Sequence, residues 1–249
     1  MNSGYLVLDI ETILDPNLPL SGDKEREGLP PPPYHSIVCI GVLWLGPDYA
    51  VRRIGIIGDN KDEAGVLADF ARFVDQHRPV IVTYNGRGFD MPVIAARCLA
   101  HGQPLHFYYA GRDVRYRFST EGHLDLMDYL SDFGAAKRSR LDVTAKLCGM
   151  PGKVGVDGKD VGPMVHAGRV EEVKAYCTCD VLQTAGVFLR VQLLRGELTR
   201  DAYLVAMRGL MNAASKDARL EPVCEAWDES RLLLGENSTP PAALEDAAQ

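Results

Sequence analysis

The chain has 249 residues, of which 46% are apolar and 24% are charged, and these proportions are typical of a globular protein with a full hydrophobic core. Its net charge of −7 argues against a broad surface that coats nucleic acid, and no apolar run reaches the roughly 20 residues of a membrane span. The N-terminal stretch MNSGYLVLDIET lacks the basic and long apolar segments of a secretory signal, and the six cysteines show neither a disulfide framework nor zinc spacing. We therefore expect a cytoplasmic protein with reduced thiols and no membrane partner.

The hydrophobic pattern predicts a mixed α/β protein in which three early strands are followed by a helix, a fourth strand and further helices. Strands are predicted at residues 5–10, 37–45, 51–57 and 79–84. Helices are predicted at residues 62–77, 89–101, 124–133, 141–148, 169–194 and 199–212. Residues 14–36 are rich in proline, glycine and charge and favour a long loop. We expect one domain over residues 1–212 with the first strand central, and a C-terminal extension over 213–249 whose end is disordered.

Two acids stand near the end of the first predicted strand. Side chains of a strand alternate between its faces, so Asp9 and Glu11 share one face and their carboxylates can converge. Converging carboxylates repel unless a cation lies between them, and magnesium is a usual partner of all-oxygen sites. The pattern alone is weak evidence, because the predicted loop repeats it at Asp23 and Glu25, where we interpret it as surface charge.

A second motif, YNGRGFDMPVI, covers residues 84–94 and follows the fourth predicted strand. The strand ends, a glycine-containing turn follows, and Asp90 stands at the start of the next helix. Such a position can direct a carboxylate toward the edge of a sheet. The alternative is that Asp90 only caps the helix while Phe89 fills the core.

A third motif, AYCTCD, covers residues 175–180 of the long predicted helix. Tyr176 and Asp180 are four residues apart and therefore lie on one face. The same spacing of tyrosine and aspartate occurs at two other places in the chain, so it is not selective by itself. Apolar neighbours such as Val173 and Val181 predict that this helix packs inward and brings Asp180 to the rim of the sheet.

Taken in order, the blocks LVLDIET, YNGRGFDMPVI and YCTCDVLQT resemble the DEDD superfamily of 3′–5′ exonucleases, in its tyrosine subgroup. The histidine subgroup would place His five residues before the last aspartate, where this chain has Ala175. The chain looks most similar to predicted exonucleases related to the proofreading domain of family B DNA polymerases, over roughly residues 5 to 195. The resemblance implies a ribonuclease H-like fold with a mixed central β-sheet flanked by helices on both faces.

The resemblance also implies two divalent cations, Mg²⁺ or Mn²⁺, and a role for each motif residue. Asp9 would bridge both ions, and Glu11 and Asp180 would complete the ion on the nucleophile side. Asp90 would hold the second ion, partly through water. Tyr176 would orient the attacking water, because a phenol with a reference pKa near 10 is a poor base at neutral pH.

The resemblance places substrate contacts beside the motifs. Thr12 and Leu14 would touch the terminal nucleotide, and Asn85 would hydrogen-bond the nucleic acid. Phe89 would stack against a base, or it is an ordinary core residue. The segment HLDLMDYL at residues 123–130 also resembles a family segment, in which Asp125 either supports the structure or contacts the chain end.

The implied function is a metal-dependent 3′–5′ exonuclease that hydrolyses phosphodiester bonds at the 3′ end of single-stranded DNA and releases nucleoside monophosphates. Because only a short segment follows the last motif, we expect a stand-alone nuclease or a subunit. Two alternatives remain open: an RNA-directed enzyme of the same fold, and a non-catalytic nucleic-acid-binding module. A group of basic residues is either a solvated face or a track for phosphates: Arg112, Arg115, Arg117, Lys137, Arg138 and Arg140.

Overall fold

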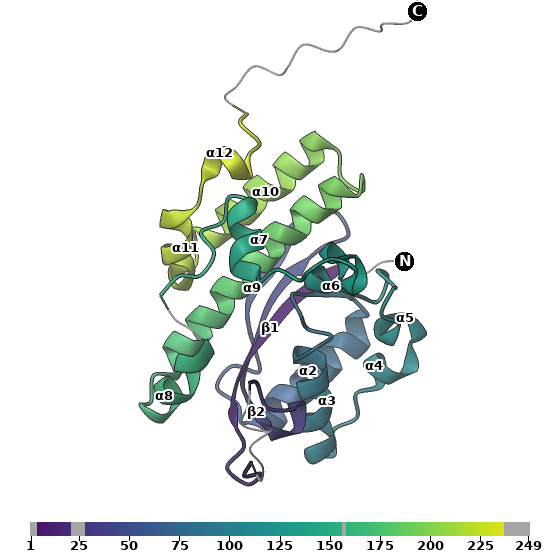
Figure 1. Cartoon of the computed structure of the whole chain (residues 1–249), viewed down its shortest axis with the longest axis vertical. Coiled ribbons are helices and arrows are strands. Elements are labelled where there is room, and N and C mark those ends of the chain that lie inside the picture. Colours follow the sequence, from purple (N-terminus) through teal and green to yellow (C-terminus); the bar gives the residue numbers. More distant parts are fainter. Residues whose placement is uncertain (1–3, 21–27, 156–157, 237–249) are drawn as a thin grey trace, which may run out of the picture.

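The computed structural model describes residues 4–20, 28–155 and 158–236 (Figure 1). Its described strands form one five-stranded sheet in the order β3-β2-β1-β4-β5. β1 pairs antiparallel with β2 and parallel with β4, so the sheet is mixed and β1 is its central strand, as predicted. The acid pattern of the predicted loop, at Asp23 and Glu25, and the predicted disordered end, from residue 237 on, lie outside the described residues.

β1 (Tyr5–Leu14) is longer than the predicted strand, which ended at residue 10. The strand continues because β2 (His35–Leu45) pairs with it along its whole length, to the pair Leu14 and His35. The register shifts between Glu11 and Thr12, which marks a bulge in this pairing. The predicted loop over 14–36 is therefore shorter at both ends and includes the 3₁₀ turn η1 (Pro32–Tyr34).

The remaining strands follow from short apolar runs. β3 (Val51–Ile57) returns from β2 as the predicted hairpin, and β4 (Val80–Thr83) is completely buried. β5 (His123–Asp125) was missed by the sequence pattern, which assigned most of these residues to a helix. Three residues are too few to show a strand period, and β5 is defined only by its parallel pairing with β4.

α9 (Val170–Leu194) covers one face of the sheet and lies along β1 and β2 (Figure 1). α10 (Arg200–Ala214) packs against α9. Gly41 of β2 makes the close approach of α9 to the sheet feasible. A Cβ atom at Gly41 would lie 2.7 Å from the Cys177 sulfur and 3.1 Å from a Val181 methyl group, both on α9. The missing side chain therefore lets α9 rest directly on the strands that carry the acids.

The opposite face is covered by α2 (Glu63–His77) and α3 (Asp90–Ala100), whose apolar side chains pack on Leu6, Leu8 and Ile10 of β1. A buried Arg97 of α3 forms ion pairs of 2.6 Å with both Asp15 and Glu63. This network ties α2 and α3 to the segment that follows β1. Helices thus flank the sheet on both faces, as the sequence predicted.

Shorter elements surround these layers. They are α4 (His106–Ala110), α5 (Arg112–Arg115), α6 (Leu126–Leu130), η2 (Asp132–Gly134), α7 (Leu141–Leu147), η3 (Gly158–Asp160), α8 (Val161–His166), η4 (Ala218–Leu220), α11 (Glu221–Ala226) and α12 (Glu229–Leu232). The predicted helix over 124–133 is in fact the end of β5, then α6 and the start of η2, because the Asp125 carboxylate caps α6 and starts the helix there. No helix within the described residues is long and apolar enough to cross a membrane.

The predicted division at residue 212 falls inside α10. Beyond it, Leu220, Val223 and Leu232 are buried in the same core cluster as the apolar side of α9. The backbone N–H of Asp228 also donates to the carbonyl of Gly149, at 2.7 Å, and so ties this segment to the loop after α7. The described part of the extension is therefore packed on the domain, while the division into a domain and an extension stays a prediction.

Candidate active site

The site begins with the face of β1 that points toward α9. Val7 on this face is buried in the core shared with α9, and the next two positions on the same face are Asp9 and Glu11. The apolar residues in between, Leu8 and Ile10, point to the opposite core. The strand alternation therefore places both acids on one face, as predicted from the sequence.

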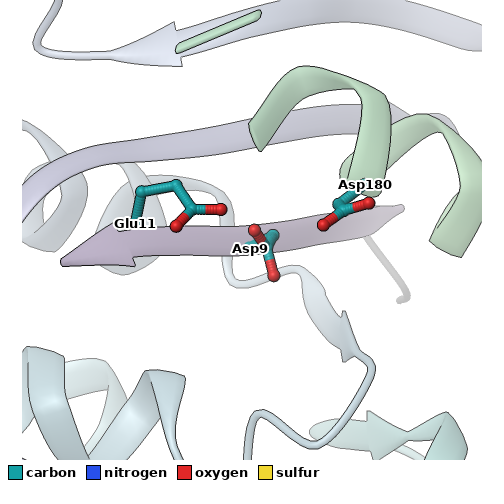
Figure 2. A group of neighbouring side chains, drawn as sticks. All are labelled: Asp9, Glu11 and Asp180. Carbon is teal, nitrogen blue, oxygen red and sulfur yellow. The ribbon is translucent and has the colours of Figure 1, made fainter. Parts of the chain in front are cut away.

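Asp180 reaches the same place from α9. Oxygen atoms of Asp9, Glu11 and Asp180 all lie within 4.8 Å of one another. Figure 2 shows the three carboxylates side by side, two from the strand and one from the helix. Residues from distant parts of the chain are thus brought into one cluster by the packing of α9 on β1.

Asp90 lies next to this cluster but is not among the three close carboxylates of the described residues. It is the first residue of α3, and its Oδ1 accepts a hydrogen bond of 3.1 Å from the backbone N–H of Ile10. Among the neighbouring charges, that of Asp90 makes the largest contribution to the raised pKa of Asp9. The structure therefore brings all four predicted acids together around residues 9–11 of β1.

Burial raises the pKa of every one of these acids in the metal-free protein, and repulsion from the other acids of the cluster adds to this for Asp9 and Glu11. Burial raises the pKa of Asp9, with further increases from Asp90, Glu11 and Asp180. The pKa of Glu11 is raised chiefly by burial, that of Asp90 to about 7 and that of Asp180 to about 6, again mainly by burial. Glu11 and Asp90 are buried and Asp9 and Asp180 are half-buried, so all four carboxyl groups are held where their charge is costly.

The donor set fits hard divalent cations. Among the described residues no basic side chain forms an ion pair with Asp9, Glu11 or Asp180, and Lys153 only lowers the pKa of Asp180 from nearby. Carboxylate oxygens are the ligands that Mg²⁺ and Mn²⁺ prefer, and such an ion would supply the missing positive charge. Asp9, Glu11 and Asp180 could therefore bind a metal, with Asp90 at its side.

Tyr176 stands one helical turn before Asp180 on α9, and its hydroxyl lies close enough to the Asp180 carboxylate to lower the pKa of that acid. Burial and the neighbouring charges of Asp180, Glu11 and Asp9 raise the pKa of Tyr176 far above its usual value. The phenol therefore remains protonated at neutral pH. The predicted pairing of Tyr176 with Asp180 is thus present in the structure.

Two cysteines that the sequence left as ordinary thiols lie inside the site. Cys177 of α9 places its sulfur 3.4 Å from the backbone oxygen of Asp9 and 3.6 Å from its carboxylate. Cys177 also lies near Cys39 of β2, which raises the pKa of the Cys177 thiol and pairs with Glu11 across the sheet. The available signal was the position of Cys177 directly after Tyr176, but only the packing of α9 shows which acid it touches.

The predicted substrate residues of β1 lie at its exposed end. The Thr12 hydroxyl is 2.9 Å from Nδ1 of His35, whose Nε2 is 2.9 Å from the carbonyl of Pro30. Since the carbonyl can only accept, Nε2 of His35 donates to it, and in the neutral ring Nδ1 then accepts from the Thr12 hydroxyl. Leu14 is 48% exposed, so its side chain is accessible to a ligand.

Asn85 and Phe89 frame the turn before α3. Asn85 adopts a left-handed conformation with φ of 72°, and its carbonyl accepts from the backbone N–H groups of Gly88 and Phe89. Phe89 is half-buried, packs on the core below α2 and α3, and meets the His35 ring edge-on at 5.0 Å. The contacts of both residues with a substrate stay predictions.

Asp125 has a different environment from the other predicted substrate residues. Its carboxylate accepts from the backbone N–H groups of Asn85 at 2.9 Å, Arg87 at 2.9 Å, Met127 at 3.1 Å and Asp128 at 3.3 Å. Of the two roles that the sequence left open, these contacts favour the supporting one. Asp125 fixes the turn that carries the second motif.

Comparison with known proteins identifies the fold and the family. Residues 29–230 match the family described as predicted 3′–5′ exonucleases related to the exonuclease domain of PolB. The chain belongs to this family. Asp90, Tyr176 and Asp180 lie within the matched residues, whereas Asp9 and Glu11 precede them. No curated protein matches the chain.

A solved structure similar to this PolB-related exonuclease is the family B DNA polymerase from the hyperthermophilic archaeon Pyrobaculum calidifontis. The TM-score is 0.54 at 22% sequence identity, and the match covers 92% of this chain and 28% of the polymerase chain. The PolB-related exonuclease therefore spans less than a third of the length of that polymerase. The match confirms the predicted α/β, ribonuclease H-like fold with its mixed sheet.

Proposed function

We propose that this 3′–5′ exonuclease hydrolyses the terminal phosphodiester bond at the 3′ end of single-stranded DNA, with two divalent cations, and releases nucleoside monophosphates. The observation that supports it most is the cluster of Asp9, Glu11 and Asp180, whose oxygens lie within 4.8 Å without an ion-pair partner among the described residues. A structural core gains nothing from such a cluster, because uncompensated buried charge is costly.

Each acid has its part in holding the cations. The charges of Asp90, Glu11 and Asp180 all raise the pKa of Asp9, so Asp9 is near all three acids. This position would suit a ligand shared by two ions. Glu11 and Asp180 would hold one cation together with Asp9, and Asp90 would hold the other. When bound, Mg²⁺ or Mn²⁺ supplies positive charge for the phosphate and makes water a stronger nucleophile.

Tyr176 orients the attacking water. Its hydroxyl stays protonated, since its pKa is raised, and it is already aligned by the Asp180 carboxylate. A protonated phenol can accept from a water as well as donate, so it can fix the position of that water without removing its proton. We assign Tyr176 a positioning role beside the acids.

The terminal nucleotide is bound by residues around the acids. Thr12 and Leu14 at the end of β1 contact its sugar and base, and Asn85 donates a hydrogen bond to the strand. The exposed part of Phe89 stacks on a base, a contact worth roughly 1–3 kcal/mol that does not depend on sequence. Asp125 acts on the substrate through the turn that it supports.

A 5′-labelled single strand incubated with Mg²⁺ or Mn²⁺ tests the proposal. We expect a ladder of products shortened from the 3′ end, with mononucleotides released, and no ladder with Asp9→Asn or Asp180→Asn. Undegraded substrate in both metals, or undiminished activity of both variants, would contradict it. Asp48→Asn is the control, because this exposed acid pairs with Arg52 on the β2–β3 hairpin.

Competition between DNA and RNA strands of the same sequence decides the sugar preference. Faster loss of the RNA would favour the RNA-directed alternative, whose recognition depends on a pocket for the 2′-hydroxyl. Calorimetric titration with Mn²⁺ addresses the non-catalytic alternative. If no heat of Mn²⁺ binding is measured while the protein still binds the strand, the result would favour that alternative.

A further inference from the structure

A cavity of about 360 Å³ opens beside the turn that leads to Asp90. Asn85 and Gly88 of this turn form part of its wall. Farther from the turn, three exposed arginines line the cavity: Arg115, Arg117 and Arg138. In a chain with a net charge of −7, a concentration of positive charge next to the second motif requires a reason.

The positive charge of this cavity is only partly neutralised. The Asp128 carboxylate accepts from Arg117 at 2.6 and 2.7 Å and from Arg138 at 3.1 Å, so two guanidinium groups share one acid. Among the described residues Arg115 has no carboxylate partner, and its guanidinium lies over the rings of Tyr108 and Tyr109, at 5.8 and 4.9 Å from their centres. Guanidinium donors thus remain available for an anion.

The arginine-bearing segment is held firmly to the turn of the second motif. Arg87 of the turn donates to the carbonyls of Val114 at 3.1 Å, Tyr116 at 3.1 Å and His123 at 2.6 Å. Its own backbone N–H is held by Asp125. The exposed arginines therefore keep a fixed position relative to the carboxylate cluster, which a surface loop would not provide.

Exposed aromatic rings lie among these arginines. Tyr109 is 58% exposed, Tyr116 47% and Phe118 55%. Phe118 packs edge-on against Tyr116 at 5.7 Å and against Phe133 at 4.8 Å, which holds its ring at the surface. A solvated basic face does not require exposed rings, whereas single-stranded nucleic acid is bound by this combination of arginines and stacking rings.

We name these residues the arginine–aromatic surface: Tyr109, Arg115, Tyr116, Arg117, Phe118 and Arg138. The helices α4 and α5 and the neighbouring α6 lie together at one side of the molecule (Figure 1). We propose that this surface binds the part of the single strand on the 5′ side of the reacting nucleotide, with phosphates on the arginines and bases on the rings. The inference rests on the proposed function, because the acid cluster defines where the 3′ end lies.

Two variants test the surface without disturbing the acids. Arg115→Ala/Arg138→Ala removes charge but leaves Arg117 to pair with the buried Asp128. Tyr109→Ser/Tyr116→Ser removes two exposed rings. The control is Arg52→Ala/Arg208→Ala, which removes the same charge from exposed arginines of β3 and α10 that pair with Asp48 and Glu236.

The first readout compares two substrates. A strand of about 20 nucleotides is long enough to reach the arginine–aromatic surface, whereas a dinucleotide is too short. We expect the arginine variant to lower kcat/KM for the long strand by roughly tenfold at moderate salt, and to leave the dinucleotide unchanged. The slope of log Kd against log salt should fall by about 0.7 for every phosphate that the variant no longer neutralises. Equal decreases for both substrates, or an equal decrease in the control, would overturn the proposal.

The second readout measures binding without hydrolysis. The variants are combined with Asp9→Asn, and the anisotropy of a fluorescent strand of the same length is followed. If the surface variants bind the strand more weakly than the control, the result supports the arginine–aromatic surface. Absence of hydrolysis would count against the proposed function alone. Hydrolysis by the wild type with unchanged binding in both surface variants would overturn the surface alone.

Discussion

The carboxylate of Asp90, the first residue of α3, accepts a hydrogen bond of 3.1 Å from the backbone N–H of Ile10, which lies between Asp9 and Glu11 in β1. β4 pairs with β1 only as far as Val7, so the N–H of Ile10 would otherwise lack this partner on that side. The second motif therefore continues the edge of the sheet where β4 has ended. One hydrogen bond fixes Asp90 relative to both acids of the strand.

Loss of a carboxylate from the cluster should abolish metal binding while preserving the fold. For Asp9→Asn and Asp180→Asn we expect Mn²⁺ affinity to fall by more than about 100-fold, since even partners outside the ligand sphere contribute roughly 10–100-fold. In EDTA the free energy of unfolding should stay equal or rise, because repulsion in the cluster is relieved. Calorimetry and thermal unfolding measure both effects, and metal binding equal to that of Asp48→Asn would refute the assignment.

The metal-free protein should lose stability as pH rises through the raised pKa values. The pKa of Asp90 is about 7 and that of Asp180 about 6 in the folded chain, against about 4 in the unfolded chain. Between these values the folded state holds the protons more tightly, so the free energy of unfolding falls from about pH 4 to about pH 7. Buried His123, whose pKa is lowered, acts in the opposite direction below about pH 6.5, where the unfolded chain binds the extra proton.

Comparing Asp90→Asn with the wild type separates the effect of the Asp90 carboxyl on stability from that of His123, because both proteins contain His123. Thermal unfolding in EDTA at several pH values should show the variant gaining relative stability as pH rises, because it has no charge to bury. Saturating Mg²⁺ should reverse the trend in the wild type. A difference between variant and wild type that does not change with pH would exclude the predicted linkage.

Tyr176→Phe removes the hydroxyl that meets Asp180. We expect kcat to fall by about 100-fold, because misplacement of the attacking water by about 1 Å can cost that much. Metal affinity should change little, since the three carboxylates remain. Tyr5→Phe at the other end of β1, where the hydroxyl meets Tyr49, is the matched control and should keep its activity.

A further expectation for Tyr176 concerns the pH profile. Because the pKa of Tyr176 is raised, its hydroxyl should not lose its proton near a pH of about 10. The pH–rate profiles of the wild type and of Tyr176→Phe should therefore have the same shape in this range. The rate of both proteins is measured from neutral to alkaline pH. An inflection that is present in the wild type and absent from the variant would assign the phenol a role as base instead of a positioning role.

Gly41→Ala tests the close approach of α9 to the sheet. The new methyl group would lie 2.7 Å from the Cys177 sulfur, so α9 must move away from β2. Overpacking of this kind costs about 1–3 kcal/mol, and the shift of Asp180 should also weaken Mn²⁺ binding. Gly55→Ala in β3 meets nothing within 4 Å and should leave both quantities near the wild type. Urea unfolding and calorimetry compare the two variants.

Asp125→Ala should destabilise the turn of the second motif. Its carboxylate serves four backbone N–H groups, and loss of a buried acceptor for several donors should cost about 3 kcal/mol of the free energy of unfolding. Asp125→Asn keeps one accepting oxygen and should recover part of this free energy. A stable Asp125→Ala variant with a raised KM for the strand would instead indicate direct substrate contact.

Local patterns in the sequence were enough to predict which acids share a face and the main layers of the fold. Asp9 and Glu11 share a face because a strand alternates, and Tyr176 and Asp180 share one because a helix repeats near every fourth residue. These are local periodicities, and they survive in any packing. β1 was predicted too short and β5 was missed, since both depend on pairing with a partner strand.

How the acids meet, and what surrounds them, depends on packing between distant parts of the chain. The distance between Asp9 and Asp180 depends on a helix that can settle on β2 because Gly41 has no side chain. The position of Asp90 depends on the N–H of Ile10, and Cys177 lies beside Asp9 only through the same packing. Such contacts join residues remote in the chain, so their energies depend on the folded arrangement and not on any local pattern.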